Sequence, residues 1–191
     1  MLNQHATIQD IISSTLESNK TTSEGTRAGG VFHVQCFDQD GNLKWEDKSH
    51  NLVVNQGLKD MNDKYFSGAA YTATWYLGLI TGPGSGTTFA AGDTLASHAG
   101  WTEFTDYSGN RGAVTFGAAT TADPSVITNP SPVAFTITGA GGTVAGAFLT
   151  NVATGTSGVL FSESDFQAPG DRVTVSGDVL NVTYQFSLDA A

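Results

Sequence analysis

Apolar and polar residues alternate without interruption near the end of the chain, over residues 179–188. A period of two places every second side chain on the same face of a β-strand. The segment contains neither proline nor a charged residue, which is typical of a strand in the interior of a sheet. Its apolar face carries Leu180, Val182, Tyr184, Phe186 and Leu188. We therefore expect a central strand of an antiparallel sheet here.

A second alternation begins at Val31 and predicts a β-hairpin. Phe32 and Cys36 share one face, and Leu43 and Trp45 alternate with charged residues after a turn at Asp40-Gly41. An Asp-Gly pair between two alternating segments is a strong signal for a tight hairpin turn.

Further short strand candidates, separated by turn residues, follow along the chain. Only 14% of the residues are charged and 23 of 191 are glycine, a composition that favours strands over helices. Many short strands with turns between them predict an all-β protein, built as an antiparallel β-sandwich or barrel. The candidates are residues 74–80, 102–107, 113–116, 133–138, 143–150, 159–161 and 172–175.

The N-terminal region differs from the rest of the chain. Four apolar residues lie at positions i, i+3, i+4 and i+8, which predicts one apolar face of a short helix. A polar segment, 17–30, follows and is typical of a flexible tether. We expect an N-terminal arm over residues 1–30 and a β-sandwich domain over 31–191. The arm would either pack on its own sandwich or dock on a neighbouring subunit through Ile8, Ile11, Ile12 and Leu16.

One or two short helices are expected within the sandwich domain. Asn55 is a plausible N-cap for a helix with Leu58, Met61, Tyr65 and Phe66 on its apolar side. Asp93 is a candidate cap for a single further helical turn.

Charge and cysteine content exclude several classes of protein. Eight Lys and Arg against eighteen Asp and Glu give a net charge of −10, which is unsuited to binding nucleic acid. A single cysteine, Cys36, cannot form an intramolecular disulfide. No run of eighteen apolar residues occurs and the first thirty residues lack a secretory signal pattern, so we expect neither membrane insertion nor secretion.

No motif predicts a metal or cofactor site. Residues 38–42, DQDGN, resemble a calcium loop, but the glycine is fourth rather than sixth and residue 49 is serine where glutamate is required. A hairpin turn is the better interpretation. The four histidines are scattered, without the close spacing of zinc ligands. We expect that folding needs no metal and no cofactor.

Two groups of residues leave a catalytic or sugar-binding interpretation open. The carboxylate pairs Glu163/Asp165 and Asp171/Asp178 could serve a glycosidase, although acidic loop residues are expected in so acidic a chain. The aromatic residues of the segment 101–107, WTEFTDY, form either a sugar-stacking platform or part of the core. The core is the favoured interpretation, and we predict that the protein is not an enzyme.

Several segments resemble a group of short virion proteins of tailed phages. They are HNLVVNQGL at 50–58, WYLGL at 75–79, DTLASHAGWTE at 93–103, GAFL at 146–149, and the segment 177–186 that begins with Gly-Asp. The resemblance covers residues 31–188 in the same order. It implies a phage structural accessory protein, of a kind that often includes capsid decoration or cement proteins with jelly-roll-like folds.

The resemblance implies a function outside catalysis. We expect a decoration protein on the outer capsid surface of the virion, made in the host cytoplasm, that bridges subunits of the major capsid protein and forms a homo-oligomer, a dimer or trimer. The candidate interface is the apolar face of the arm, Ile8, Ile11, Ile12 and Leu16. The alternative is a tail- or fibre-associated receptor-binding protein that contacts host glycan through residues 101–107 or the loop 81–92.

Overall fold

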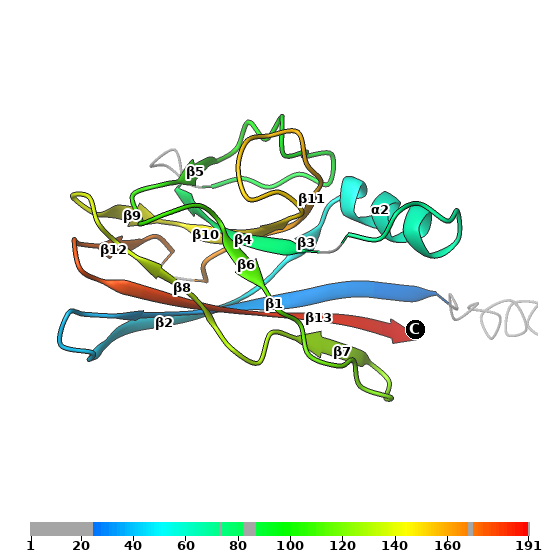
Figure 1. The fold of residues 1–191 in the computed structure, drawn as a ribbon, viewed down its shortest axis with the longest axis horizontal. Coiled ribbons are helices and arrows are strands. Elements are labelled where there is room, and N and C mark those ends of the chain that lie inside the picture. Colours follow the sequence, from blue (N-terminus) through cyan, green and yellow to red (C-terminus); the bar gives the residue numbers. More distant parts are fainter. Residues whose placement is uncertain (1–24, 73, 82–86, 168–169, 191) are drawn as a thin grey trace, which may run out of the picture.

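Two antiparallel sheets face one another across the molecule (Figure 1). The computed structural model describes residues 25–72, 74–81, 87–167 and 170–190. The first sheet has the order β2 (Leu43–His50), β1 (Thr26–Phe37), β13 (Val179–Ala190), β7 (Ser125–Thr128), and β8 (Val133–Thr136) also pairs with β13. The expected all-β antiparallel sandwich is confirmed.

The second sheet carries the one helix found among the described residues. Its strand order is β3 (Leu52–Val53), β11 (Leu160–Asp165), β10 (Gly146–Thr150), β4 (Trp75–Thr81), β5 (Thr102–Phe104), and β6 (Gly112–Val114) also pairs with β4. The helix, α2 (Asn55–Tyr65), packs against β11. A short separate pair is formed by β9 (Gly142–Val144) and β12 (Arg172–Thr174).

The alternating C-terminal segment is the central strand of the first sheet, as expected. β13 pairs with β1 along one edge and with β7 and β8 along the other. Val182 lies opposite Val34, and Tyr184 lies opposite Phe32. All four side chains are fully buried, so the period of two correctly identified the inward face of the strand.

The first strand begins earlier than the expected residue 31. β1 begins at Thr26, because the last residues of β13 continue the ladder and Ala190 pairs with Thr26. At Gly30, which was expected in the tether, β1 instead approaches β13 closely: a Cβ there would lie 2.3 Å from the carbonyl oxygen of Gln185. The glycine therefore permits strand pairing that its local sequence did not indicate.

The expected strand over 143–150 is divided between two sheets. Ala145 separates β9 from β10, and its N–H donates to the carbonyl of Ile80 at 2.7 Å. β9 then pairs with β12, whereas β10 pairs with β4 and β11. The chain changes direction at Ala145 because the two strands pair with partners in different sheets. A continuous apolar segment gives no sign of this change.

Other boundaries also moved, because pairing partners limit how far each strand extends. The strand expected over 102–107 ends at Phe104, and Tyr107 makes only an isolated bridge to Ile137. The strand expected over 159–161 extends to Asp165. β7 was missed altogether.

The second sheet is buried on both faces. Its inner face meets the first sheet in the main core, and its outer face carries a second cluster beneath the loops that join β4 to β5 and β10 to β11 (Figure 1). This accounts for the continuous apolar run of β4, since Leu77 and Leu79 lie in the main core while Ile80 lies in the outer cluster. The outer cluster consists of Val54, Ile80, Leu95, Trp101, Ala145, Phe148 and Leu160.

Two details of the expected helices are wrong. Val54 rather than Asn55 occupies the N-cap of α2, without a side-chain cap, and the N–H of Asn55 instead donates to the carbonyl of Ala91. Asp93 does not begin a helical turn: its carboxylate accepts from the N–H of Ala90 within a turn. At the start of α2, a hydrogen bond to the loop that contains Ala91 thus takes the place of a side-chain cap. Among the described residues, no helix is long and apolar enough to cross a membrane.

Candidate interaction surface

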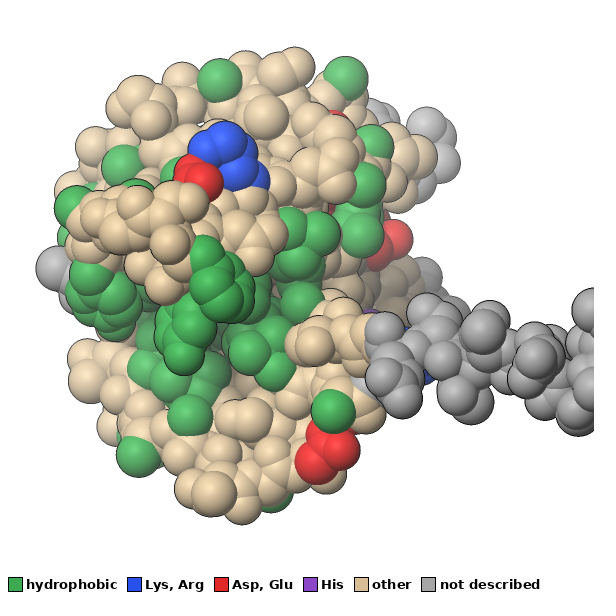
Figure 2. Space-filling view, turned by 90° about the vertical axis from the view of Figure 1, so that its right-hand side faces the viewer, with side chains coloured by type: hydrophobic (Ala, Val, Ile, Leu, Met, Phe, Trp, Pro, Cys, Tyr) green, Lys and Arg blue, Asp and Glu red, His purple; other side chains and the backbone are tan. Residues whose placement is uncertain are grey.

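An apolar cleft lies between α2 and the ends of β1 and β13 (Figure 2). Its volume is about 620 Å³. Figure 2 shows hydrophobic side chains gathered in a hollow between the two layers. The apolar and aromatic side chains that line the cleft are Met61, Tyr65, Phe66, Tyr71, Trp75, Phe161 and Leu188.

Three large aromatic side chains of this cleft lie in solvent. Tyr65 is 83% exposed, Phe66 is 78% exposed and Tyr71 is 82% exposed. The rings of Tyr65 and Phe66 meet edge to face, with centroids 4.9 Å apart. Apolar groups gathered in this way, rather than scattered singly, are typical of surfaces that bind another molecule or segment.

The floor of the cleft is part of the folded core. Phe161 is buried, and its ring meets Trp75 edge to face with centroids 5.2 Å apart. The Phe161 ring also meets Phe186 of β13 edge to face, with centroids 5.4 Å apart. The exposed aromatic groups therefore lie beside a floor of packed aromatic side chains.

A glycine in its first turn holds α2 against β11. A Cβ at Gly57 would lie 2.4 Å from the carbonyl oxygen of Phe161, so only glycine permits this approach. The neighbouring Gln56 accepts a hydrogen bond from the N–H of Leu160 at 2.8 Å. These contacts fix the helix with its C-terminal aromatic residues at the cleft.

The expected apolar side of α2 is only partly buried. Met61 packs against the main core, whereas Leu58, Tyr65 and Phe66 are exposed. The expected helix is present, and the close approach at Gly57 holds its first turn against β11. The helical period identified the apolar residues of α2 but not which of them the rest of the fold buries.

The arm residues expected to form an interface, Ile8, Ile11, Ile12 and Leu16, lie outside the described residues. The chain nevertheless enters the described part beside the cleft. Thr26, the first residue of β1, is one of the cleft residues. The first strand therefore begins at the apolar surface.

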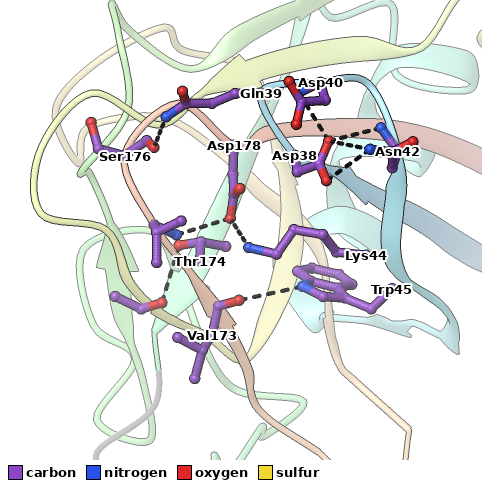
Figure 3. Close-up of polar contacts among 12 residues, drawn as sticks. Asp38, Gln39, Asp40, Asn42, Lys44, Trp45, Val173, Thr174, Ser176 and Asp178 are labelled. Carbon is purple, nitrogen blue, oxygen red and sulfur yellow. Dashed lines mark hydrogen bonds and ion pairs between the residues drawn. The ribbon is translucent and has the colours of Figure 1, made fainter.

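The acidic segment 38–42 is a hairpin turn, as expected (Figure 3). The Asp38 carboxylate accepts from the N–H of Asp40 at 3.0 Å and from the N–H of Asn42 at 2.8 Å. These hydrogen bonds, with those from the Asn42 side chain, lower the pKa of Asp38. The Asp38 carboxylate thus binds backbone N–H groups, where the calcium-loop interpretation would have it bind a cation.

A neighbouring ion pair ties this hairpin to the turn before β13 (Figure 3). The buried carboxylate of Asp178 accepts from Lys44 at 2.6 Å and from the N–H of Val175 at 2.9 Å. The Gln39 side chain also donates to the carbonyl of Ser176 at 2.8 Å. Asp178 therefore acts structurally, and the described residues contain no group of three or more His, Cys, Asp or Glu that could hold a metal.

Glu163, one of the two carboxylates of the first candidate catalytic pair, is fully buried beneath the outer loops. Its Oε2 accepts from the Trp101 indole N–H at 2.8 Å, and its Oε1 has no partner. Burial, together with the nearby Asp93, raises the pKa of Glu163 to about 8. A protonated Glu163 can donate to Asp93, so the arrangement suits a neutral carboxyl group in the core.

The second carboxylate of that pair, Asp165, lies two residues farther along the same strand. Asp165 is half-buried at the end of β11, where burial and then the charge of Asp171 raise its pKa. In the other candidate pair, Asp178 forms an ion pair with Lys44. Glu163, sealed beneath the Trp101 side chain, is not open to a polysaccharide.

The aromatic residues of the segment 101–107 belong to the core, as favoured. Trp101, Phe104 and Tyr107 are all buried. His98 stacks on Trp101 with ring centroids 3.6 Å apart. The sugar-platform alternative is wrong for these three rings. Residues 82–86 of the other candidate glycan loop lie outside the described residues.

Residues that carry the resemblance occupy structural positions. Asn51 donates to the Tyr184 hydroxyl at 2.8 Å, and the same hydroxyl accepts from Ser162 at 3.2 Å. Gly57 and Trp101 make the close approach and the indole hydrogen bond described above. These motifs specify packing. Comparison of the chain with models of protein families, with curated proteins and with solved structures finds no match.

Proposed function

We propose that the protein is a structural component of tailed-phage particles that decorates the outer surface of the capsid. In this role it binds subunits of the major capsid protein, bridges them as a homo-oligomeric dimer or trimer, and stabilises the shell. The proposal is of a binding role rather than an enzymatic one. Because binding occurs only to the assembled shell, its free energy would oppose dissociation of the particle.

The observation that carries the proposal is the exposed apolar surface around α2. Tyr65, Phe66 and Tyr71 present large aromatic side chains beside a buried floor at Phe161. Aromatic side chains are enriched in the cores of protein interfaces, where they supply much of the binding free energy. A surface of this kind suits a lasting protein contact.

Charge and the sequence resemblance support the same assignment. A net charge of −10 opposes contact with packaged DNA and favours the outer face of the shell. The segments 50–58 and 93–103 that resemble virion proteins lie in the packing framework around α2 and the outer cluster. The segments that resemble virion proteins are therefore those that hold α2 and its apolar surface in place.

The direct test is attachment of purified protein to capsids that lack it. We expect saturable binding at many copies per particle and a higher temperature of particle disruption. The paired change Phe66→Ser and Tyr71→Ser should weaken attachment more than about tenfold, as loss of interface aromatic residues does. The matched control is Val173→Ser, which changes an apolar residue that is 66% exposed and lies outside the cleft.

Copy number separates this proposal from the tail or fibre alternative. Hundreds of copies in purified virions, with density on the shell in a cryo-EM map, would support decoration. A few to a dozen copies located at the tail would instead support receptor binding, and would overturn the capsid proposal.

A further inference from the structure

We propose that the cleft is the docking site for the N-terminal segment of its own chain, with Ile8, Ile11, Ile12 and Leu16 packed between α2 and the end of β13. The first step is the fit of chemistry. The sequence predicts one apolar helical face on this segment. The cleft offers an apolar surface that no described residue covers, lined by Met61, Tyr65, Phe66 and Leu188 among others.

The second step is reach. Leu16 is joined to Thr26, itself a cleft residue, by residues 17–25. These nine residues can span up to about 30 Å when extended, at roughly 3.3–3.6 Å each. The connection is long enough to turn back and lay the apolar face into the cleft.

The third step identifies the occupant as the same chain rather than a second copy. A segment joined to its own site by only nine residues has an effective concentration there of about millimolar. A second copy, free in dilute solution, is present at far lower concentration. The chain's own segment is therefore favoured before assembly.

Charge at the rim is compatible with this occupant. Asp60 and Lys64 line the cleft and form an ion pair with each other. On the predicted helix, Asp10 and Glu17 lie away from the apolar face. Docking therefore leaves no charge of either element buried without a partner.

Disulfide trapping in the full-length protein tests the contact. Ile12→Cys is combined with Asn62→Cys, since Asn62 is an exposed cleft residue whose replacement leaves the aromatic side chains intact. The native Cys36 does not compete, because its thiol is buried and burial raises its pKa to about 12. The matched control pairs Asn62→Cys with Ser14→Cys, on the polar side of the predicted helix.

We expect an intramolecular disulfide that forms at least about tenfold faster from position 12 than from position 14. Equal rates would mean that the segment collides with the cleft without docking, and would overturn the proposal. Disulfide-linked dimers as the main product would overturn it in favour of a second copy as the occupant.

Amide hydrogen exchange gives a second test that needs no new cysteine. The paired change Ile11→Asp and Ile12→Asp should increase exchange several-fold across residues 58–66 of the full-length protein. The control, Ser13→Asp and Ser14→Asp, adds the same charge to the polar side of the predicted helix and should leave exchange unchanged. No difference between the two variants would refute the contact.

This inference concerns the free protein. Attachment to a capsid through the same aromatic side chains would require the segment to leave the cleft. Failure of trapping and of the exchange difference would leave capsid decoration standing. Failure to bind capsids, with trapping intact, would leave the intramolecular contact standing.

Discussion

Glu163 shows how a single buried carboxyl group can control stability. The side chain lies fully inside the outer cluster, hydrogen-bonded to Trp101 and adjacent to Asp93. Burial raises its pKa from 4.5 to about 8. The folded protein therefore retains a proton that the unfolded chain loses above pH 4.5.

We expect the stability contributed by this proton to be complete below pH 4.5 and to be lost as the pH rises toward about 8. Glu163→Gln, which cannot ionise, should remove this part of the decline in the free energy of unfolding. Urea denaturation at pH 5 and pH 8.5 measures it. Glu46→Gln, on the exposed face of β2, is the control and should retain the decline. An unaltered decline in Glu163→Gln would contradict the raised pKa.

Gly57 provides a second test at the same scale. Alanine favours a helix over glycine by about 1 kcal/mol, so local propensity predicts that Gly57→Ala stabilises the protein. The Cβ would lie 2.4 Å from the Phe161 carbonyl oxygen, and the resulting overpacking costs about 1–3 kcal/mol. We expect net destabilisation in thermal unfolding.

Gly92→Ala is the matched control for this change, because nothing lies within 4 Å of a Cβ at that position. Its unfolding temperature should stay close to that of the unchanged protein. Stabilisation by Gly57→Ala would show that α2 lies farther from β11.

At the scale of elements, β13 is the strand on which the first sheet depends. It is flanked on both sides, and Val182 and Tyr184 are fully buried. Replacing either by alanine should cost on the order of 2–5 kcal/mol, through lost burial and the cavity left behind.

Thermal unfolding checks this expectation, with Gln185→Ala as the control on the exposed side of the same strand. The control should change stability by less than about 0.5 kcal/mol. A shift of the unfolding temperature below about 2 °C for both core variants would contradict the central position.

The elements also show where local pattern was sufficient. The hairpin around Asp40-Gly41 and the strand beginning at Val179 followed from periods of two and from turn residues. Ala145, in contrast, sits between strands of different sheets within one apolar segment. Nothing local marks that change, because it depends on which distant strand each half pairs with.

At the scale of the whole molecule, the carboxylates in and beside the acidic turn are held by donors of the protein itself. Asp38 accepts backbone N–H groups, and Asp178 pairs with Lys44. We therefore expect excess EDTA to leave the unfolding temperature unchanged, as differential scanning fluorimetry would show. A large decrease, reversed by added calcium, would reveal a cation that these residues bind.

Local pattern predicted the sandwich, its central strand, the turn at Asp40-Gly41 and the burial of Trp101, because a strand period and a turn depend only on neighbouring residues. It also predicted the apolar stripe of the arm and that of α2. The exposed position of Tyr65 and Phe66, the start of β1 at Thr26 and the neutral environment of Glu163 required the assembled fold. Each depends on atoms brought together from distant parts of the chain, and a sequence period carries no information about which surface will cover a face.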